Sequence, residues 1–457
     1  MVCALSLYAA ALVALTWARP LWLDEILTLL IIRIPNLGAR LATTHQTPGA
    51  VPLGFEIQRL VMQWFGYSTL TARLPAALFG VLALGGMLAV AREMGTRSRW
   101  FTGLTWAVLP LLLRYSVEAR PYALALFLSV ASTFLLFRMM REPRAGWIAL
   151  YAAAVTLGLY TQPYTLFLQA GLVAPLLFEK RAPGRRVFLL GSICMLGGAL
   201  LFAPWFLVSA PSWHAYAQRM NETLVLPRKL PLLVLREISG GSYVCSLSLA
   251  AFVAAGCVSR RLGGTAKRQL LAGAACCLVL ALACDTVVGY FFAIRQILPA
   301  LVPLCLLAGE GWAEARERWG AYPRLAVLMV LVASALVKNA AYFRDRSENW
   351  EQAARRLEHD AAAGCVLYPR TDAPGLYEWF APQLKSRACG TTLQTADVFM
   401  PVTKYSNAEE VRRASEGLAS RGYQIKETEG AGEVIEIRHY EKVNASAGSR
   451  PTAPYNQ

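Results

Sequence analysis

Two adjacent carboxylates, Asp24 and Glu25, follow directly on the first hydrophobic segment of the chain. Acidic residues are scarce in this region, because only 13 of the 29 lie before residue 341. A carboxylate pair beside a hydrophobic segment costs free energy unless it is solvated, paired with a cation or used in a reaction. An ionised carboxylate can accept the proton of a hydroxyl group as that hydroxyl attacks, so Asp24 and Glu25 are candidates for general-base chemistry.

A second set of reactive residue types lies at breaks between later hydrophobic segments. Glu118, Arg120 and Tyr122 surround one such break, and Arg295 lies in another. Arginine donates paired hydrogen bonds to phosphate, and a tyrosine ring can stack on a sugar, although Tyr and Trp also form interface belts in ordinary membrane proteins. Together with the carboxylates, these residues suit an anionic substrate that carries a sugar.

The composition is that of a polytopic α-helical membrane protein. Hydrophobic residues make up 56% of the 457 residues and charged residues 16%, against about 25% in soluble domains. The net charge of +16 does not indicate nucleic-acid binding, because the basic excess lies in short clusters between apolar runs, as the positive-inside rule describes.

The basic clusters also predict the topology. If all are cytoplasmic, neighbouring clusters are separated by an even number of spans, and the apolar intervals fit hairpins. In one of them, Val187–Val258, two spans are expected on either side of a polar loop, Ser209–Glu237. The count is about 11 spans, with the N-terminus in the cytoplasm and the C-terminus outside. Asp24, Glu25, Glu118, Arg120 and Arg295 are then all expected on the outer side of the membrane.

The sequence predicts three regions. Residues 1–340 form the transmembrane domain, whose first extracytoplasmic loop covers about residues 20–70. Residues 341–442 form a small extracytoplasmic α/β domain, with strands expected at Cys365–Tyr368, Tyr423–Lys426 and Glu433–Tyr440. Residues 443–457 are expected to be disordered. Cys365 and Cys389 lie in the hydrophilic tail, where a disulfide is one of the alternatives if the tail is extracytoplasmic.

Four stretches of the sequence resemble the GT-C superfamily of polytopic glycosyltransferases, and in particular its family 39-like group. That group includes protein O-mannosyltransferases, the lipid A aminoarabinose transferase and the Rgt-type transferases. The stretch Tyr115–Leu124 is the most similar of the four to the family pattern. The others are Trp22–Glu25, Phe65–Gly80 and Phe292–Leu301. The sequence differs from the pattern at Ala50–Phe55 in the first loop, where the family usually has a Pro-Pro-Leu-Tyr-like sequence, and at Gln296, where the family has tyrosine.

The resemblance implies an inverting transfer of a sugar from a polyprenyl-phosphate donor to a glycolipid, polysaccharide or protein of the cell envelope. It implies that Asp24 is the base, Glu25 its partner, and Arg295 a phosphate ligand, with Glu118, Arg120 and Tyr122 in the substrate site. The alternative for Glu118 and Arg120 is an ion pair with each other that shapes the site. It requires no cofactor, and the sequence gives no support for a divalent metal beside Asp24 and Glu25. The alternative is a transporter or flippase of lipid-linked sugars in the plasma membrane.

Overall fold

The computed structural model describes residues 2–179, 182–219, 230–288, 293–362, 364–369, 374–390, 393 and 395–443. The chain divides into two compact units. The first consists of Met1–Ala18 with Ile31–Arg344, and the second of Arg19–Leu30 with Asp345–Gln457. The short segment that carries Asp24 and Glu25 therefore belongs to the same compact unit as the C-terminal region.

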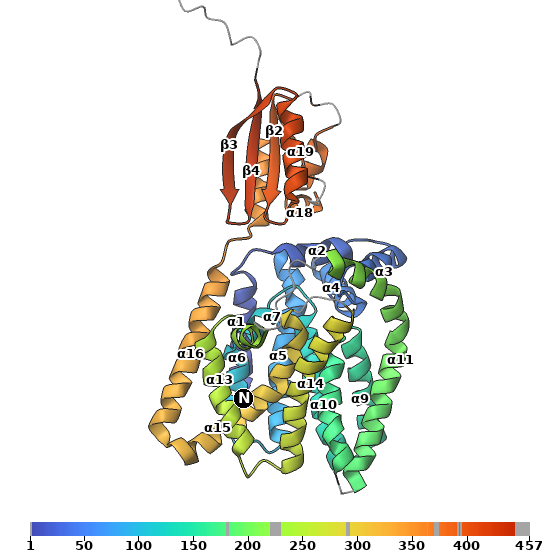
Figure 1. Cartoon of the computed structure of the whole chain (residues 1–457), viewed down its shortest axis with the longest axis vertical. Coiled ribbons are helices and arrows are strands. Elements are labelled where there is room, and N and C mark those ends of the chain that lie inside the picture. The colour runs from blue at the N-terminus through green and yellow to red at the C-terminus, as the bar shows by residue number, and fades with distance from the viewer. Residues whose placement is uncertain are drawn as a thin grey trace, which may run out of the picture. The chain divides into compact units, whose positions relative to one another are not determined.

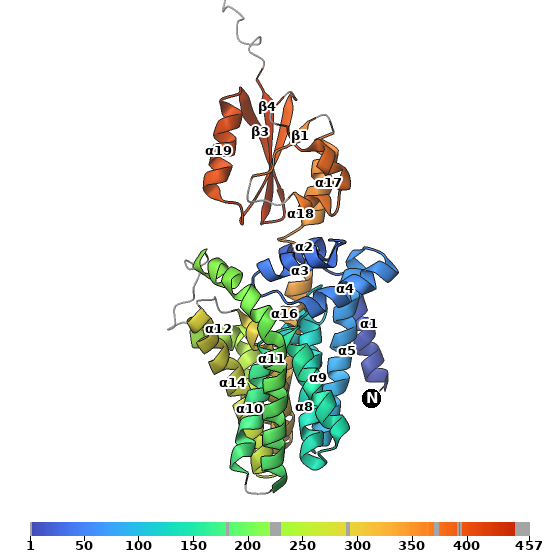
Figure 2. The same ribbon diagram turned by 90° about the vertical axis from the view of Figure 1, so that its right-hand side faces the viewer.

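The first unit is built from helices (Figures 1 and 2). In chain order they are α1 (Val2–Thr16), α3 (Leu37–Gln46), α4 (Pro52–Phe65), α5 (Thr69–Glu93), α6 (Arg99–Val108), α7 (Pro110–Tyr115), α8 (Tyr122–Arg141), α9 (Ala145–Leu159), α10 (Thr165–Val173), η1 (Ala174–Phe178), α11 (Ala182–Arg219), α12 (Leu230–Glu237), α13 (Tyr243–Val258), α14 (Gly264–Val288), η4 (Ile294–Ala300), α15 (Leu301–Trp319) and α16 (Ala321–Arg344). Helix α2 (Leu23–Ile32) begins in the second unit and ends in the first.

The predicted fold class, a polytopic helical membrane protein with a small α/β domain, is confirmed. The apolar intervals between the basic clusters are largely helical where they are described, with non-helical breaks such as Ser116–Pro121 between α7 and α8. Six of the described helices are long and apolar enough to cross a membrane, and shorter apolar helices include Ala145–Leu159 and Tyr243–Val258.

Helix α11 ends later than the sequence predicted. A polar loop was expected from Ser209, but α11 continues to Arg219 even though Pro204 and Pro211 lie inside it. On α11, Leu196, Leu200 and Leu207 are largely exposed. Leucine side chains that face outward are stable where the surrounding medium is lipid, as is expected of a helix that spans a membrane.

Glycines allow two of the helices to pack very closely. A Cβ atom on Gly311 of α15 would lie 1.7 Å from the carbonyl oxygen of Phe252 in α13. A Cβ atom on Gly256 of α13 would lie 2.1 Å from the carbonyl oxygen of Leu307. Small residues at such crossings let membrane helices gain packing contacts that larger residues would prevent.

The second unit contains a four-stranded sheet of order β1-β2-β4-β3. Strands β1 and β2 are parallel, and the other pairs are antiparallel. Helices α17 and α19 lie on opposite faces of the sheet (Figure 2). Its elements are α17 (Trp350–Asp360), β1 (Cys365–Val366), α18 (Gly375–Glu378), η5 (Pro382–Arg387), β2 (Asp397–Thr403), α19 (Ala408–Ala419), β3 (Tyr423–Ala431) and β4 (Ile435–Lys442).

Strand β2 was missed by the sequence analysis because it contains Pro401, which lacks the N–H that a central strand donates. In the structure, β1 pairs only as far as Phe399, so Pro401 has a strand on one side alone, where it pairs with Ile437 of β4. The predicted disordered tail, residues 443–457, lies outside the described residues apart from Val443.

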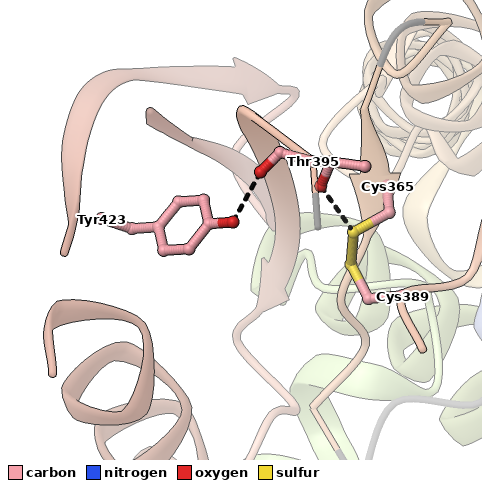
Figure 3. Close-up of a disulfide and its surroundings, with 4 residues drawn as sticks. All are labelled: Cys365, Cys389, Thr395 and Tyr423. Carbon is pink, nitrogen blue, oxygen red and sulfur yellow. Dashed lines mark hydrogen bonds between the residues drawn. A yellow bond between two sulfur atoms is a disulfide. The ribbon is translucent and has the colours of Figure 1, made fainter. Parts of the chain in front are cut away.

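The Cys365–Cys389 disulfide is formed (Figure 3). It joins the start of β1 to the segment that follows η5, with a Cα–Cα distance of 4.9 Å. The Thr395 hydroxyl lies 3.4 Å from Cys365 Sγ, and the Tyr423 hydroxyl donates a hydrogen bond to the Thr395 carbonyl oxygen. The disulfide therefore attaches the segment after η5 to β1, which is an edge strand of the sheet.

Candidate active site

Asp24 and Glu25 occupy the first turn of α2. Negative side chains are favoured there, because the first backbone N–H groups of a helix have no partners within the helix and its dipole is positive at that end. Asp24 is half-buried, whereas Glu25 is fully buried at 0% exposure. The two carboxylates are therefore adjacent in sequence but lie in different surroundings.

Glu25 acts as a helix cap. Its Oε2 accepts a hydrogen bond from the backbone N–H of Trp22 at 3.2 Å, which is the contact that a glutamate at the third helical position makes in a capping box. This contact stabilises the turn on which Asp24 stands. It gives Glu25 a positioning role in the structure, in addition to the catalytic role expected from the resemblance.

Glu348 contacts the same turn, although the sequence analysis did not select it. The backbone N–H of Leu23 donates to Glu348 Oε2 at 3.0 Å. Trp350 Nε1 donates to the same oxygen at 3.3 Å, and the Tyr405 hydroxyl donates to Glu348 Oε1. Glu348 is 8% exposed, so this buried carboxylate is held by three donors from separate parts of the chain.

An ion pair also joins the first residues of this segment to the C-terminal region. Arg19 donates to Asp345 Oδ2 at 3.1 Å, and the Ser347 backbone N–H donates to Asp345 Oδ1 at 2.8 Å. Burial favours the neutral acid, but the hydrogen bond from Ser347 and the charges of Arg19 and Arg346 together lower the pKa of Asp345. The Asp345 carboxyl is therefore ionised at neutral pH and pairs with Arg19.

Tyr405 lies within electrostatic range of Asp24. The pKa of its phenol is raised by burial first, and then by its hydrogen bond to Glu348 and the negative charges of Glu348 and Asp24. Asp24 therefore lies near enough to Tyr405 for its charge to act there. Within the described residues, no group of three or more His, Cys, Asp or Glu side chains is arranged to hold a metal ion.

Glu118 lies in the first unit, in the turn between α7 and α8. Its Oε1 accepts hydrogen bonds from Arg114 Nε and from the Tyr342 hydroxyl, both at 2.7 Å, and its side chain is 1% exposed. The expected ion pair with Arg120 is not among the contacts described for Glu118. Residues four apart face each other on a helical turn, so Arg114 reaches Glu118 first, and this spacing was visible in the sequence.

Arg120 instead contacts Tyr122. One of its nitrogens donates to the Tyr122 hydroxyl at 3.2 Å, and its guanidinium carbon lies 5.6 Å from the centre of that ring. Tyr122 is buried at 4% exposure and packs edge-on against Tyr115, with ring centres 4.7 Å apart. The ring of Tyr122 therefore packs between Tyr115 and Arg120 and supports the guanidinium group.

Arg295 lies at the start of η4 and is half-buried. It is close enough to Tyr115 for its charge to act on the phenol, so it shares the surroundings of the Glu118 group. The next residue, Gln296, donates to the Tyr164 hydroxyl at 3.0 Å and accepts from the Ala293 backbone N–H at 2.6 Å. Gln296, which replaces the family tyrosine, fixes the backbone beside Arg295.

Gly54, which lies in the other stretch that differs from the family pattern, also has a packing role. A Cβ atom at this position of α4 would lie 2.3 Å from the Cβ of Pro121. The neighbouring Gln58 donates to the carbonyl oxygens of Ala72, at 2.8 Å, and Ala119, at 3.3 Å. Close approach at Gly54 and these hydrogen bonds fix the turn that carries Glu118 and Arg120.

Comparison with known proteins agrees with this fold. Residues 46–208 match the family described as dolichyl-phosphate-mannose-protein mannosyltransferase. This range includes Glu118, Arg120 and Tyr122, whereas Asp24 and Glu25 precede it and are not part of the match. No curated protein sequence matches the chain.

Three solved structures illustrate the similarity. ArnT from Cupriavidus metallidurans, bound to undecaprenyl phosphate, has a TM-score of 0.59 at 15% identity, over 94% of this chain and 97% of that one. The arabinofuranosyltransferase AftD from Mycobacteria has a TM-score of 0.51 at 16% identity, over 97% of this chain and 42% of that one. The oligosaccharyltransferase of Archaeoglobus fulgidus has a TM-score of 0.52 at 11% identity, over 83% of this chain and 63% of that one.

The fold is thus that of the GT-C class of polytopic membrane glycosyltransferases, which confirms the resemblance found in the sequence. Within that class, residues 46–208 carry the sequence pattern of the dolichyl-phosphate-mannose-protein mannosyltransferase family.

Proposed function

We propose that this protein is a membrane glycosyltransferase that uses a sugar linked to a polyprenyl phosphate. The observation that carries the proposal is the similarity of fold, along 94% of the chain, to a protein whose structure contains undecaprenyl phosphate. The acceptor is a glycolipid, polysaccharide or protein of the cell envelope, and transfer takes place on the outer face of the plasma membrane.

In the proposed reaction, Asp24 is the general base. A hydroxyl oxygen of the acceptor attacks the anomeric carbon of the sugar, and its proton passes to the Asp24 carboxylate. The bond from the anomeric carbon to the phosphate oxygen breaks with inversion, and polyprenyl phosphate leaves with that electron pair. Glu25, through its contact with the Trp22 N–H, holds the turn that presents Asp24.

Arg120 and Arg295 are the proposed ligands of the departing phosphate. Guanidinium groups stabilise charge that develops on phosphate oxygens as the bond breaks. The contact of Arg120 with the Tyr122 hydroxyl supports this role, because it restricts the guanidinium before substrate binds. Glu118 acts indirectly, by holding Arg114 and Tyr342.

The Cys365–Cys389 disulfide supports an extracytoplasmic location for the second unit. Disulfides persist in oxidising compartments and are rare in the cytoplasm. With the C-terminus outside and an odd number of spans, the N-terminus is cytoplasmic. This orientation agrees with the basic clusters between the apolar segments.

Cells that lack the gene and are complemented with variants test the proposal. Mass spectrometry of surface glycans and glycolipids should show one sugar missing without the gene, restored by the wild type and not by Asp24→Asn. Asp360→Asn makes the same chemical change at another position of the second unit and should restore the sugar. Restoration by Asp24→Asn at the wild-type level would overturn the assignment of the base.

A transporter of lipid-linked sugars is distinguished by purified protein in detergent, where no membrane separates two compartments. With a total extract of polyprenyl-phosphate sugars and the acceptor isolated from the gene-deficient cells, a transferase forms the glycosylated product. A transporter forms none under these conditions.

A further inference from the structure

A groove in the first unit lies outside the proposed catalytic groups. Helices α1, α5 and α6 enclose it, with a cavity volume of about 650 Å³, and its lining is mostly apolar. Leu5 and Tyr8 contribute from α1, and Leu88 and Leu104 from α5 and α6. This volume is in the range of pockets that bind small molecules.

One end of the groove carries two arginines and a tryptophan. Arg92 lies in the last turn of α5, and Arg99 and Trp100 begin α6. Both arginines and Trp100 are exposed. Tryptophan and arginine at the ends of membrane helices lie at the level of the lipid headgroups, so this end of the groove faces that level.

The acidic side chains near this end are already paired with other cations. Glu93, next to Arg92, contacts Arg141 at 3.0 Å and Arg138 at 3.4 Å.

Three further acidic side chains near this end form ion pairs with Arg97. Arg97 contacts Glu310 and Glu314 at 2.8 Å and Glu317 at 2.9 Å. Among the residues that the structure describes, neither the Arg92 nor the Arg99 side chain has a hydrogen-bond or ion-pair partner, so two positive charges remain at the mouth of the groove.

The floor of the groove is open at Gly85 of α5. A Cβ atom at this position would meet no heavy atom within 4 Å, although Gly85 lines the groove. About two helical turns separate Gly85 from Arg92, which is on the order of 10 Å along α5. An alkyl chain that lies in this open space therefore reaches a headgroup placed between the arginines.

We propose that this groove is a binding site for an anionic phospholipid, whose acyl chain lies along α5 and whose phosphate is bound by Arg92 and Arg99. The apolar lining selects a lipid over a free anion, and the two arginines select an anionic headgroup over a zwitterionic one. The site is independent of the proposed glycosyl transfer.

Native mass spectrometry of the purified full-length protein tests the site. The protein is incubated with phosphatidylglycerol or with phosphatidylcholine of the same chain length, and bound lipid is counted. Phosphatidylglycerol should be retained about tenfold more than phosphatidylcholine, and the double variant Arg92→Gln/Arg99→Gln should lose about tenfold of that retention. The matched control is Arg260→Gln/Arg316→Gln, which removes two exposed arginines away from the groove and should retain the lipid.

A second pair of variants tests the acyl-chain position. Gly85→Phe fills the groove and should lower retention of both lipids. Gly197→Phe makes the same change at an exposed position of α11 that also has open space at its Cβ, and should not.

Three results would overturn the proposal. They are equal retention of the two lipids by the wild type, equal loss in the two arginine double variants, and displacement of phosphatidylglycerol by equimolar polyprenyl phosphate, which would assign the groove to the sugar donor. If Gly85→Phe does not fold, the arginine variants decide the outcome alone.

Discussion

The backbone N–H of Leu23 donates a hydrogen bond to Glu348 Oε2 at 3.0 Å, across 325 residues of sequence. Leu23 begins the helix whose first turn carries Asp24 and Glu25, and Glu348 immediately precedes the first helix of the C-terminal region. The proposed base therefore stands on a turn that is held from both sides, by Glu25 within the helix and by Glu348 from the distant end of the chain.

Glu348→Gln should loosen this turn. A hydrogen bond to a charged acceptor contributes about 1.5–3 kcal/mol, so hydrogen exchange of the backbone amides at residues 22–25 should accelerate by about tenfold or more. Glu351→Gln, an exposed position in the first turn of α17, is the control and should leave exchange unchanged. Identical exchange in wild type and Glu348→Gln would show that Glu348 does not stabilise the turn.

Arg114→Gln should destabilise the first unit, because it leaves the Glu118 carboxylate buried without its ionic partner. Breaking a buried pair costs about 3 kcal/mol, and thermal unfolding in detergent should shift downward accordingly. Arg144 pairs with Glu142 on the surface, with side chains 67% and 48% exposed. Arg144→Gln should therefore change stability by less than about 1 kcal/mol. A similar shift in both variants would contradict the special role of the buried pair.

Gly54→Ala should displace the turn that carries Arg120, since the new Cβ would approach Pro121 Cβ to 2.3 Å. Overpacking of this kind costs about 1–3 kcal/mol, and glycosyl transfer should fall together with the unfolding temperature. Gly146→Ala, where the added atom meets nothing within 4 Å, is the control. Wild-type stability and activity in Gly54→Ala would mean that α4 can move without consequence.

Removing the disulfide should destabilise the second unit. Cys365 and Cys389 are 24 positions apart in the sequence, and a loop of this length corresponds to about 3.5 kcal/mol in the chain-entropy account. Alkylation before and after reduction, followed by mass spectrometry, should show both thiols protected in protein taken from cells. Free thiols at both positions would contradict an oxidising compartment for this unit. Cys276→Ser, at a half-buried free cysteine, should have no comparable effect.

Acidification should weaken the contact between Arg19 and Asp345. Because folding lowers the pKa of Asp345, its contribution to stability is complete above the ordinary value of 3.8 and is lost as pH falls through the lowered folded value. The difference in unfolding free energy between wild type and Asp345→Asn should be constant near neutral pH and shrink below about pH 4. A constant difference for Asp345→Asn at all pH values would contradict the titration of Asp345.

Much of the fold was predictable because it depends on local patterns. Apolar runs of span length can avoid exposing backbone polar groups to lipid only as helices, so the segments from Val2 to Val337 could be assigned one by one. Strand β2 could not, because Pro401 is compatible with a strand only where the neighbouring strand has ended. The end of α11 was also mispredicted, since a polar composition does not by itself stop a helix.

The sequence alone determined the membrane class of the protein, its resemblance to the GT-C glycosyltransferases and the candidates Asp24, Glu118, Arg120 and Arg295, because residue type and chain order carry that information. Only the tertiary structure decided their partners. Glu348 reaches Leu23, and Tyr342 reaches Glu118, from more than 200 residues away. No local spacing specifies such contacts, because they depend on how buried polar groups find hydrogen bonds once the helices and the sheet have packed.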